Sequence, residues 1–255
     1  MSGSLVIVGL GPGSPDLLTP AAARALRAAT DLVGYGPYLN RIPEIISGQR
    51  RHASDNRVEV ERARHALTLA AEGRKVAVVS GGDPGVFAMA AAVFEAIEIG
   101  DPDWRELDIR VEPGVTAMLA AAAEVGAPLG GDFCAVSLSD NLKSWETIER
   151  RLRAAAQGDF VTALYNPASK ARPHQLGQAF DLLRTIKSPQ TVVLFVQKAA
   201  TSETRVIVTT LAEADPALAD MRTLVIIGAA ATRLIPRTGR RPWVYTPRAE
   251  TGIVR

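Results

Sequence analysis

Short apolar runs alternate with longer amphipathic stretches along most of the chain. In the first half the apolar runs are 5–8, 31–33, 75–80 and 109–111, and the helical stretches are 19–29, 58–72, 87–97 and 116–125. Thr19 suits the N-cap of the first helix and Pro20 its first turn, and Gly73 suits the end of the second helix. Strands that alternate with helices in this way predict a parallel sheet with helical crossovers.

A glycine- and proline-rich segment at 126–131 predicts a linker, after which the pattern resumes. The later apolar runs are 133–138, 160–164, 191–197, 204–209 and 223–227, with helical stretches at 144–156 and 173–186. The short spacing between 191–197 and 204–209 predicts a hairpin, and hence a mixed sheet. We therefore predict two α/β domains, 1–127 and 132–246, with a ligand cleft between them.

Composition narrows the class of protein. The 255 residues are 47% hydrophobic and 22% charged, which indicates a folded globular protein rather than a disordered or collagen-like one. No apolar run approaches the roughly 18 residues of a membrane-spanning helix. The first run has no basic residues before it and is too short for a signal peptide, so a cytoplasmic location is expected. A lone Cys134 and three histidines argue against a disulfide framework or a metal centre.

The charge distribution is mild, with a net charge of +2. Such a balance gives no reason to expect nucleic acid as a partner. The basic stretch 237–241 has no aromatic residues among its charges and is predicted to be an exposed loop. Arginine outnumbers lysine, which reflects either genome composition or the recognition of carboxylates or phosphates.

The first candidate motif is the glycine-rich turn 9–13, which follows the first strand directly. It is either a structural turn or a ligand-binding one, and a nicotinamide dehydrogenase is one class to consider. Against that class, Ser14 replaces the last glycine of the dinucleotide motif, and no acidic residue ends the second strand, which runs into Tyr35. Pro12 also lacks the amide donor that a phosphate would use.

Three further turns follow predicted strands at 81–85, 112–117 and 165–169. In α/β sheets, ligands bind outside the carboxyl ends of the strands. Each turn also has a structural interpretation, because Asp83 and Thr116 are both suited to cap the helix that follows them. Together the four turns predict one binding site.

These motifs resemble those of the tetrapyrrole (corrin-pathway) S-adenosylmethionine methyltransferases. The similarity lies in the turn 9–13 with its Leu-Leu-Thr sequel at 17–19, the Gly-Gly-Asp-Pro loop at 81–84 and the Pro-Gly-Val-Thr-Ala step at 113–117, and it spans residues 4–236. The segments 33–38, 80–89, 137–151 and 165–172 resemble the ring-contracting branch of the family. The chain departs from that branch at 87–88, 141 and 143–144.

The resemblance implies a homodimer of two-domain α/β chains, with S-adenosylmethionine in the cleft, S-adenosylhomocysteine as its product, and a tetrapyrrole polycarboxylate as substrate. By alignment of the motifs, the cofactor would contact Pro12, Gly81, Gly82, Asp83, Val86, Thr116 and Ala117, and, in the second half, Asn166, Leu194 and Ala229.

Methyl transfer asks a protein mainly to position its reactants, whereas ring contraction also moves protons. The candidate acids and bases are Asp83, Asp140, Tyr35 and Lys198. Lys170 and Arg172 are candidates to bind substrate carboxylates. A solvated or capping role is the alternative for Asp140, Lys170 and Arg172. At the level of function, the alternatives are another methyltransferase of the family, a dehydrogenase, and a tetrapyrrole carrier without turnover.

Overall fold

The computed structural model describes residues 3–43, 48–55, 58–169 and 171–249, and it divides the chain into two compact units. The first unit is Met1–Ala117 and the second is Met118–Arg255. These units differ from the predicted ranges 1–127 and 132–246. The predicted linker contains a short strand, β6 (Gly126–Ala127), which pairs with β13 (Arg240–Tyr245) and so belongs to the second unit.

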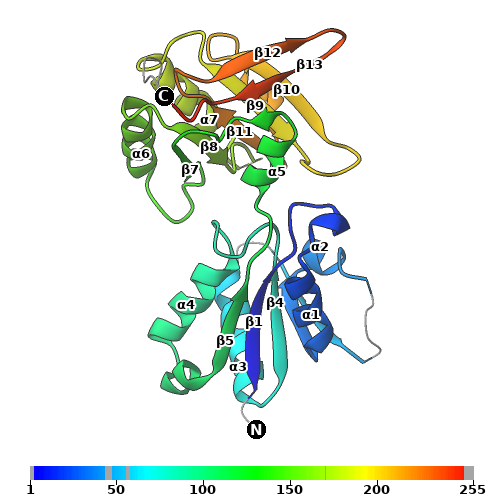
Figure 1. Ribbon diagram of the computed structural model, residues 1–255. Coiled ribbons are helices and arrows are strands. Elements are labelled where there is room, and N and C mark those ends of the chain that lie inside the picture. Colours follow the sequence, from blue (N-terminus) through cyan, green and yellow to red (C-terminus); the bar gives the residue numbers. More distant parts are fainter. Residues whose placement is uncertain (1–2, 44–47, 56–57, 170, 250–255) are drawn as a thin grey trace. The chain divides into compact units, whose positions relative to one another are not determined.

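The first unit is a five-stranded parallel sheet with helices on both faces (Figure 1). The strand order is β3 (Arg50–Ser54), β2 (Asp31–Tyr35), β4 (Lys75–Ser80), β1 (Ser4–Gly9) and β5 (Asp108–Glu112). The helices are α1 (Pro20–Ala28), α2 (Gly36–Leu39), α3 (Glu59–Ala71) and α4 (Met89–Ile99), with 3₁₀ turns η1 (Pro15–Leu17) and η2 (Pro102–Glu106). The predicted parallel sheet with helical crossovers is confirmed.

Nearly continuous burial along β2 and β4 explains why helices cover both faces of the sheet, because successive side chains of a strand point to opposite faces. Leu5, Ile7 and Val78 pack with α3 and α4, while Val8 and Val79 pack with α1 and the segment after α2. The predicted N-cap of α1 is confirmed, because the Thr19 hydroxyl accepts a hydrogen bond from the Ala22 amide at 3.1 Å. Because helices cover both faces of the sheet, the connecting loops lie at the ends of the strands.

The second unit contains a five-stranded mixed sheet. Its order is β10 (Arg205–Thr210), β9 (Val192–Gln197), β11 (Thr223–Ile227), β8 (Val161–Tyr165) and β7 (Phe133–Ser137). Helices α6 (Trp145–Gln157) and α7 (Gln175–Arg184) pack on it, with α5 (Ala117–Ala123) and the 3₁₀ turn η3 (Pro216–Leu218) also in this half. The predicted β9–β10 hairpin and the mixed sheet are confirmed.

A third, three-stranded sheet corrects the prediction for the basic stretch 237–241. This stretch is not a loop but the turn and flanking strand residues of a hairpin between β12 (Arg233–Arg237) and β13. The guanidinium of Arg237 lies 4.1 Å from the centre of the Trp243 ring. Trp243 lies outside the stretch 237–241, so the residues of that stretch alone did not indicate that it pairs as a hairpin.

Candidate functional site

Two glycine turns meet at the carboxyl end of the first sheet. Gly11 follows β1 and Gly82 follows β4, and each donates its amide to the carbonyl of the other, at 3.1 and 2.9 Å. Their φ angles are 71° and 66°, the left-handed region that glycine adopts without a steric penalty. The predicted meeting of these two loops is therefore found within the first unit.

The loop after β5 packs against the same place, main chain to main chain. A Cβ on Gly114 would lie 2.3 Å from the Gly82 carbonyl oxygen, and one on Gly9 would lie 2.6 Å from the Gly114 nitrogen. Asp83 joins two of the loops, since Oδ1 accepts the Gly85 amide at 2.8 Å and Oδ2 accepts the Gly114 amide at 3.0 Å. Three strand ends thus form one rigid main-chain surface.

The remaining first-unit residues of the predicted cofactor site lie on these same loops. Thr116 is buried, and its Cα and the Ala117 nitrogen are the atoms nearest to the position of a Cβ on Gly82, at 3.8 Å. The Val86 amide donates to the Asp83 carbonyl at 3.3 Å, and Pro12 directly follows Gly11. All of the first-unit candidates are therefore neighbours.

The segment 35–41 also reaches these loops. Its Tyr35 is a candidate acid or base, whereas Tyr38 and Arg41 were not assigned to the site from the sequence. The Tyr38 ring packs so closely on Gly81 that a Cβ there would lie 2.7 Å from the nearest ring atom. The rings of Tyr35 and Tyr38 pack edge to face, with 5.4 Å between their centres. Arg41 donates to the carbonyls of Leu10 and Gly11 at 3.2 and 3.0 Å. Burial raises the pKa of the Tyr38 phenol, although Arg41 acts in the opposite direction. The available signal for Tyr38 was its place in the segment 33–38, which resembles the ring-contracting branch of the family.

Helix α4 begins two residues later than expected, because Phe87 has a φ of 52° and cannot continue a helix. This left-handed conformation is unusual for a bulky side chain and raises the energy of the folded state. The ring is 51% exposed. A strained, exposed aromatic residue therefore lies two residues after the glycine loop 81–85.

In the second unit, parallel strands β7, β8 and β9 end at one edge of the mixed sheet. Asn166 follows β8 with a φ of 53°, and its side-chain Nδ2 donates to the Ser137 hydroxyl at 3.0 Å. Arg172 donates to the Asn166 carbonyl at 3.3 Å, and Gln175 donates to Asp140 Oδ2 at 3.0 Å.

The other second-unit candidates are more dispersed. Lys198 follows β9 with a φ of 49° and is ion-paired with Glu203. Leu194 is buried within β9, and Ala229 follows β11, which is antiparallel to β8. Ala229 therefore lies at the opposite end of β8 from Asn166. Lys170 lies outside the described residues.

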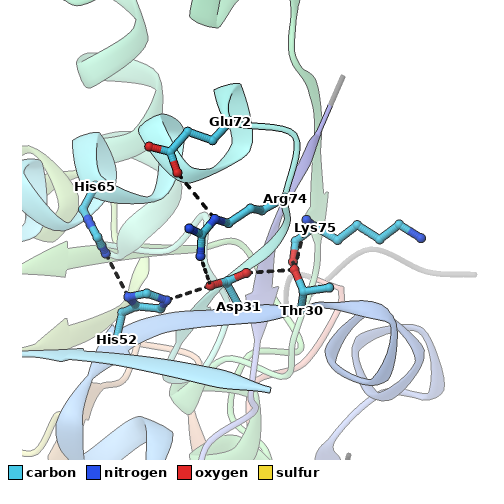
Figure 2. A network of polar contacts seen from close by, with 7 residues as sticks. All are labelled: Thr30, Asp31, His52, His65, Glu72, Arg74 and Lys75. Atoms are coloured by element: carbon cyan, nitrogen blue, oxygen red, sulfur yellow. Dashed lines mark hydrogen bonds and ion pairs between the residues drawn. The ribbon is translucent and has the colours of Figure 1, made fainter. Parts of the chain in front are cut away.

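A separate polar network occupies the amino end of the first sheet (Figure 2). Asp31 Oδ1 contacts His52 Nε2 at 2.8 Å and Arg74 at 3.1 Å, and His52 Nδ1 contacts His65 Nε2 at 3.0 Å. The side chain of Asp31 is 2% exposed. Burial acts to raise the pKa of Asp31, but the hydrogen bonds from its partners outweigh burial, so the pKa lies below its ordinary value.

This network is satisfied from within. A carboxylate only accepts hydrogen bonds, so His52 donates through Nε2 and, when both rings are neutral, accepts at Nδ1 from His65. Within the described ranges, no three histidine, cysteine or acidic side chains are arranged to hold a metal ion. None of the helices in that part of the chain has the length and apolarity needed to cross a bilayer.

The chain belongs to the tetrapyrrole (corrin/porphyrin) methylases, whose family model matches residues 4–215. This membership sets aside the dehydrogenase alternative, and the expected fold of the family is confirmed.

Among individual relatives, the precorrin-3B C(17)-methyltransferase of Sinorhizobium sp is 56% identical over 99% of both chains. The crystal structure of the methyltransferase CobJ matches with a TM-score of 0.91 and 55% identity, over 96% of this chain and all of that one. A uroporphyrin-III C-methyl transferase from Thermus thermophilus, complexed with S-adenyl homocysteine, shares the fold at a TM-score of 0.66 and 24% identity, over 89% and 97% of the chains.

Proposed function

We propose that this chain methylates precorrin-3B at carbon-17 with contraction of the macrocycle, as a step of cobalamin biosynthesis. The observation that carries the proposal is its 56% identity with the Sinorhizobium precorrin-3B C(17)-methyltransferase over 99% of both chains. The likeness to CobJ, at a TM-score of 0.91, supports it. Sequence identity over nearly the whole chain covers both units, and so it extends beyond a shared cofactor motif.

The cofactor of the proposed reaction is S-adenosylmethionine, and the first unit fits it. A Cβ on Gly82 would meet no atom closer than 3.8 Å, so there is room for one more atom in van der Waals contact with Thr116 and Ala117. We assign binding to the first-unit candidates Pro12, Gly81, Gly82, Asp83, Val86, Thr116 and Ala117. The second-unit residues Asn166, Leu194 and Ala229 stay predictions of the family resemblance. When bound, S-adenosylmethionine supplies an activated methyl group, and S-adenosylhomocysteine remains.

The chain itself positions reactants and moves protons. Both Asp83 oxygens are occupied by main-chain amides, so we assign Asp83 to holding the loops and not to proton transfer. Among the remaining candidates, Lys198 is engaged by Glu203, whereas the Gln175 amide orients Asp140 through one oxygen. We therefore assign the acid or base of ring contraction to Asp140, with Tyr35 as the alternative.

We further propose a homodimer that works in the cytoplasm, where S-adenosylmethionine is made and used. A tetrapyrrole polycarboxylate is its partner, with no nucleic acid or membrane required. Sedimentation of the purified chain at micromolar concentration tests the assembly, and a monomer would contradict it.

The test of function is incubation with precorrin-3B and S-adenosylmethionine labelled in its methyl group. The expected product carries one labelled methyl group and has the changed absorbance of a contracted ring. Parallel reactions with uroporphyrinogen III and with the cobalt-bearing counterpart of precorrin-3B define the substrate. Label transfer to either of these but not to precorrin-3B would assign the chain to another step of the family. Tight tetrapyrrole binding without any label transfer would identify a carrier.

A further inference from the structure

Buried polar atoms without partners concentrate in one short segment. In the described part of the chain such side-chain atoms are Gln49 Oε1, Ser169 Oγ, Arg172 Nε and Gln175 Oε1. All but the first lie within 169–175, in the segment between β8 and the first residue of α7. A buried donor or acceptor that makes no hydrogen bond costs about 1–3 kcal/mol, so this clustering requires an explanation.

The local backbone places two of these atoms side by side. Ser169 and Arg172 exchange main-chain hydrogen bonds of 3.2 and 3.0 Å as an antiparallel bridge. Side chains of such a bridged pair lie on the same face. The guanidinium is fixed at its other end, where Nη1 donates to the Asn166 carbonyl at 3.3 Å. Ser169 Oγ and Arg172 Nε are therefore held on one face of a tight turn.

The chemistry of this pair selects the ligand. Arg172 carries a permanent charge, and in the described residues no carboxylate lies within ion-pair distance of it. The Nε–H group is a donor, and the serine hydroxyl can also donate. Donors that include a cation suit a carboxylate, because charge-assisted hydrogen bonds are the strongest of this kind. Gln175 Oε1 is an acceptor, which a carboxylate cannot satisfy, and is outside the pair.

We propose that Ser169 and Arg172 form a subsite for one peripheral carboxylate of the tetrapyrrole substrate. Arg172 Nε–H and Ser169 Oγ–H each donate a hydrogen bond to that carboxylate. The inference rests on the proposed function for the identity of the substrate. It adds Ser169, which the motif comparison did not single out, and it specifies which atom of Arg172 binds.

Two substitutions test the subsite through different atoms. Ser169→Ala removes the hydroxyl but keeps the main-chain bridge, and Arg172→Lys keeps the charge but removes Nε–H. Loss of one hydrogen bond to a charged group is expected to raise the KM for precorrin-3B about tenfold in either variant. The melting temperature of Ser169→Ala should stay the same or rise, because the substitution removes a buried hydroxyl without a partner. Matched controls are Ser202→Ala and Arg153→Lys, both at exposed positions.

The outcomes separate this inference from the proposed function. Unchanged KM in both variants, with normal methyl transfer to precorrin-3B, would overturn the subsite alone and leave an ordered water as its occupant. If the wild-type chain does not methylate precorrin-3B, fluorescence titration with uroporphyrin III, another tetrapyrrole polycarboxylate, still tests the subsite. About tenfold weaker binding by both variants would support it. Equal affinities, or no binding by the wild type, would overturn it.

Discussion

The carboxyl ends of the two main sheets differ in the residues that form their loops. In the first unit, glycines at 9, 11, 82 and 114 bring main chains into contact, and the Asp83 carboxylate is satisfied on both oxygens. In the second unit, non-glycine residues adopt the left-handed conformation at 166, 198 and 200, and side-chain atoms of Ser169 and Arg172 lack partners. The Asp83 carboxylate of the first unit thus has its hydrogen-bond partners within the chain. Ser169 Oγ and Arg172 Nε of the second unit have none.

This difference fits a division of labour in the proposed reaction. In the proposed reaction, the main-chain surface of the first unit would bind the cofactor. The unsatisfied donors of the second unit would bind carboxylates of the substrate. Substitutions in the first unit should therefore act mainly through packing, whereas those at Ser169 and Arg172 should act through substrate affinity.

The largest expected effect is that of Gly114→Ala. Its Cβ would lie 2.3 Å from the Gly82 carbonyl oxygen and 2.9 Å from the Gly9 Cα, and neither main-chain atom can move without separating the loops. Overpacking of this kind should lower the free energy of unfolding by about 3 kcal/mol, measured by urea denaturation. Methyl transfer should be lost with it. Gly36→Ala is the control, since a Cβ there meets nothing within 4 Å. A fully stable Gly114→Ala would contradict the main-chain contact.

The amino end of the first sheet provides a reference region that is remote from the loops. Asp31→Asn removes a buried charge that His52 and Arg74 contact, at a cost of about 2 kcal/mol near neutral pH. The pKa of Asp31 is lowered in the folded state. Its contribution is therefore complete above the pKa of the unfolded chain and is lost as the pH falls through the lower folded value, below about pH 4.

Unfolding free energies measured between pH 2 and pH 6 should thus converge for wild type and Asp31→Asn at the acid end. The KM for the tetrapyrrole should not change. Asp181→Asn is the control, because its exposed ion pair with Arg184 contributes little. A difference between wild type and Asp31→Asn that is independent of pH would show that the charge is not the cause.

Sequence patterns predicted the parts of the fold that depend on local chemistry. The buried strands β1, β4 and β11 are continuous apolar runs, and the N-cap Thr19 precedes its helix with the expected side-chain hydrogen bond. Strand β3 was missed, because an edge strand of arginine, histidine and serine has no apolar run. The pairing of β6 with β13 joins residues more than a hundred positions apart, which no local pattern reports.

The candidate site divides in the same way. Glycine is its own signal for a tight turn, so the loops at 9–13 and 81–85 were located correctly. The left-handed Phe87 was predicted to be helical, since nothing in a phenylalanine indicates positive φ. The roles of Tyr38 and Arg41 depend on how α2 packs beside the glycine loops. The missing partners of Ser169 and Arg172 follow from burial, which only the folded chain defines.

A smaller effect is expected for Asp83→Asn. The asparagine oxygen can accept one of the two amides from Gly85 and Gly114, but its NH₂ group would face the other. Loss of a charge-assisted hydrogen bond should cost about 1.5 kcal/mol of unfolding free energy and lower kcat. Because Asp83 positions the loops, the pH profile of the remaining activity should keep the wild-type shape. A missing limb in that profile would instead make Asp83 the acid or base.

The smallest expected effect concerns Phe87, the exception among the glycine turns of the first unit. Glycine adopts a φ of 52° freely, whereas other residues pay about 1 kcal/mol for it. Phe87→Ala keeps this strain and removes the ring, and Phe87→Gly removes both. Phe87→Gly should therefore unfold at higher urea than Phe87→Ala, by about 1 kcal/mol in free energy. Equal stability of the two variants would mean that the loop is not strained. Phe87 would then differ from Asn166 and Lys198 of the second unit, whose positive φ angles indicate strained backbone.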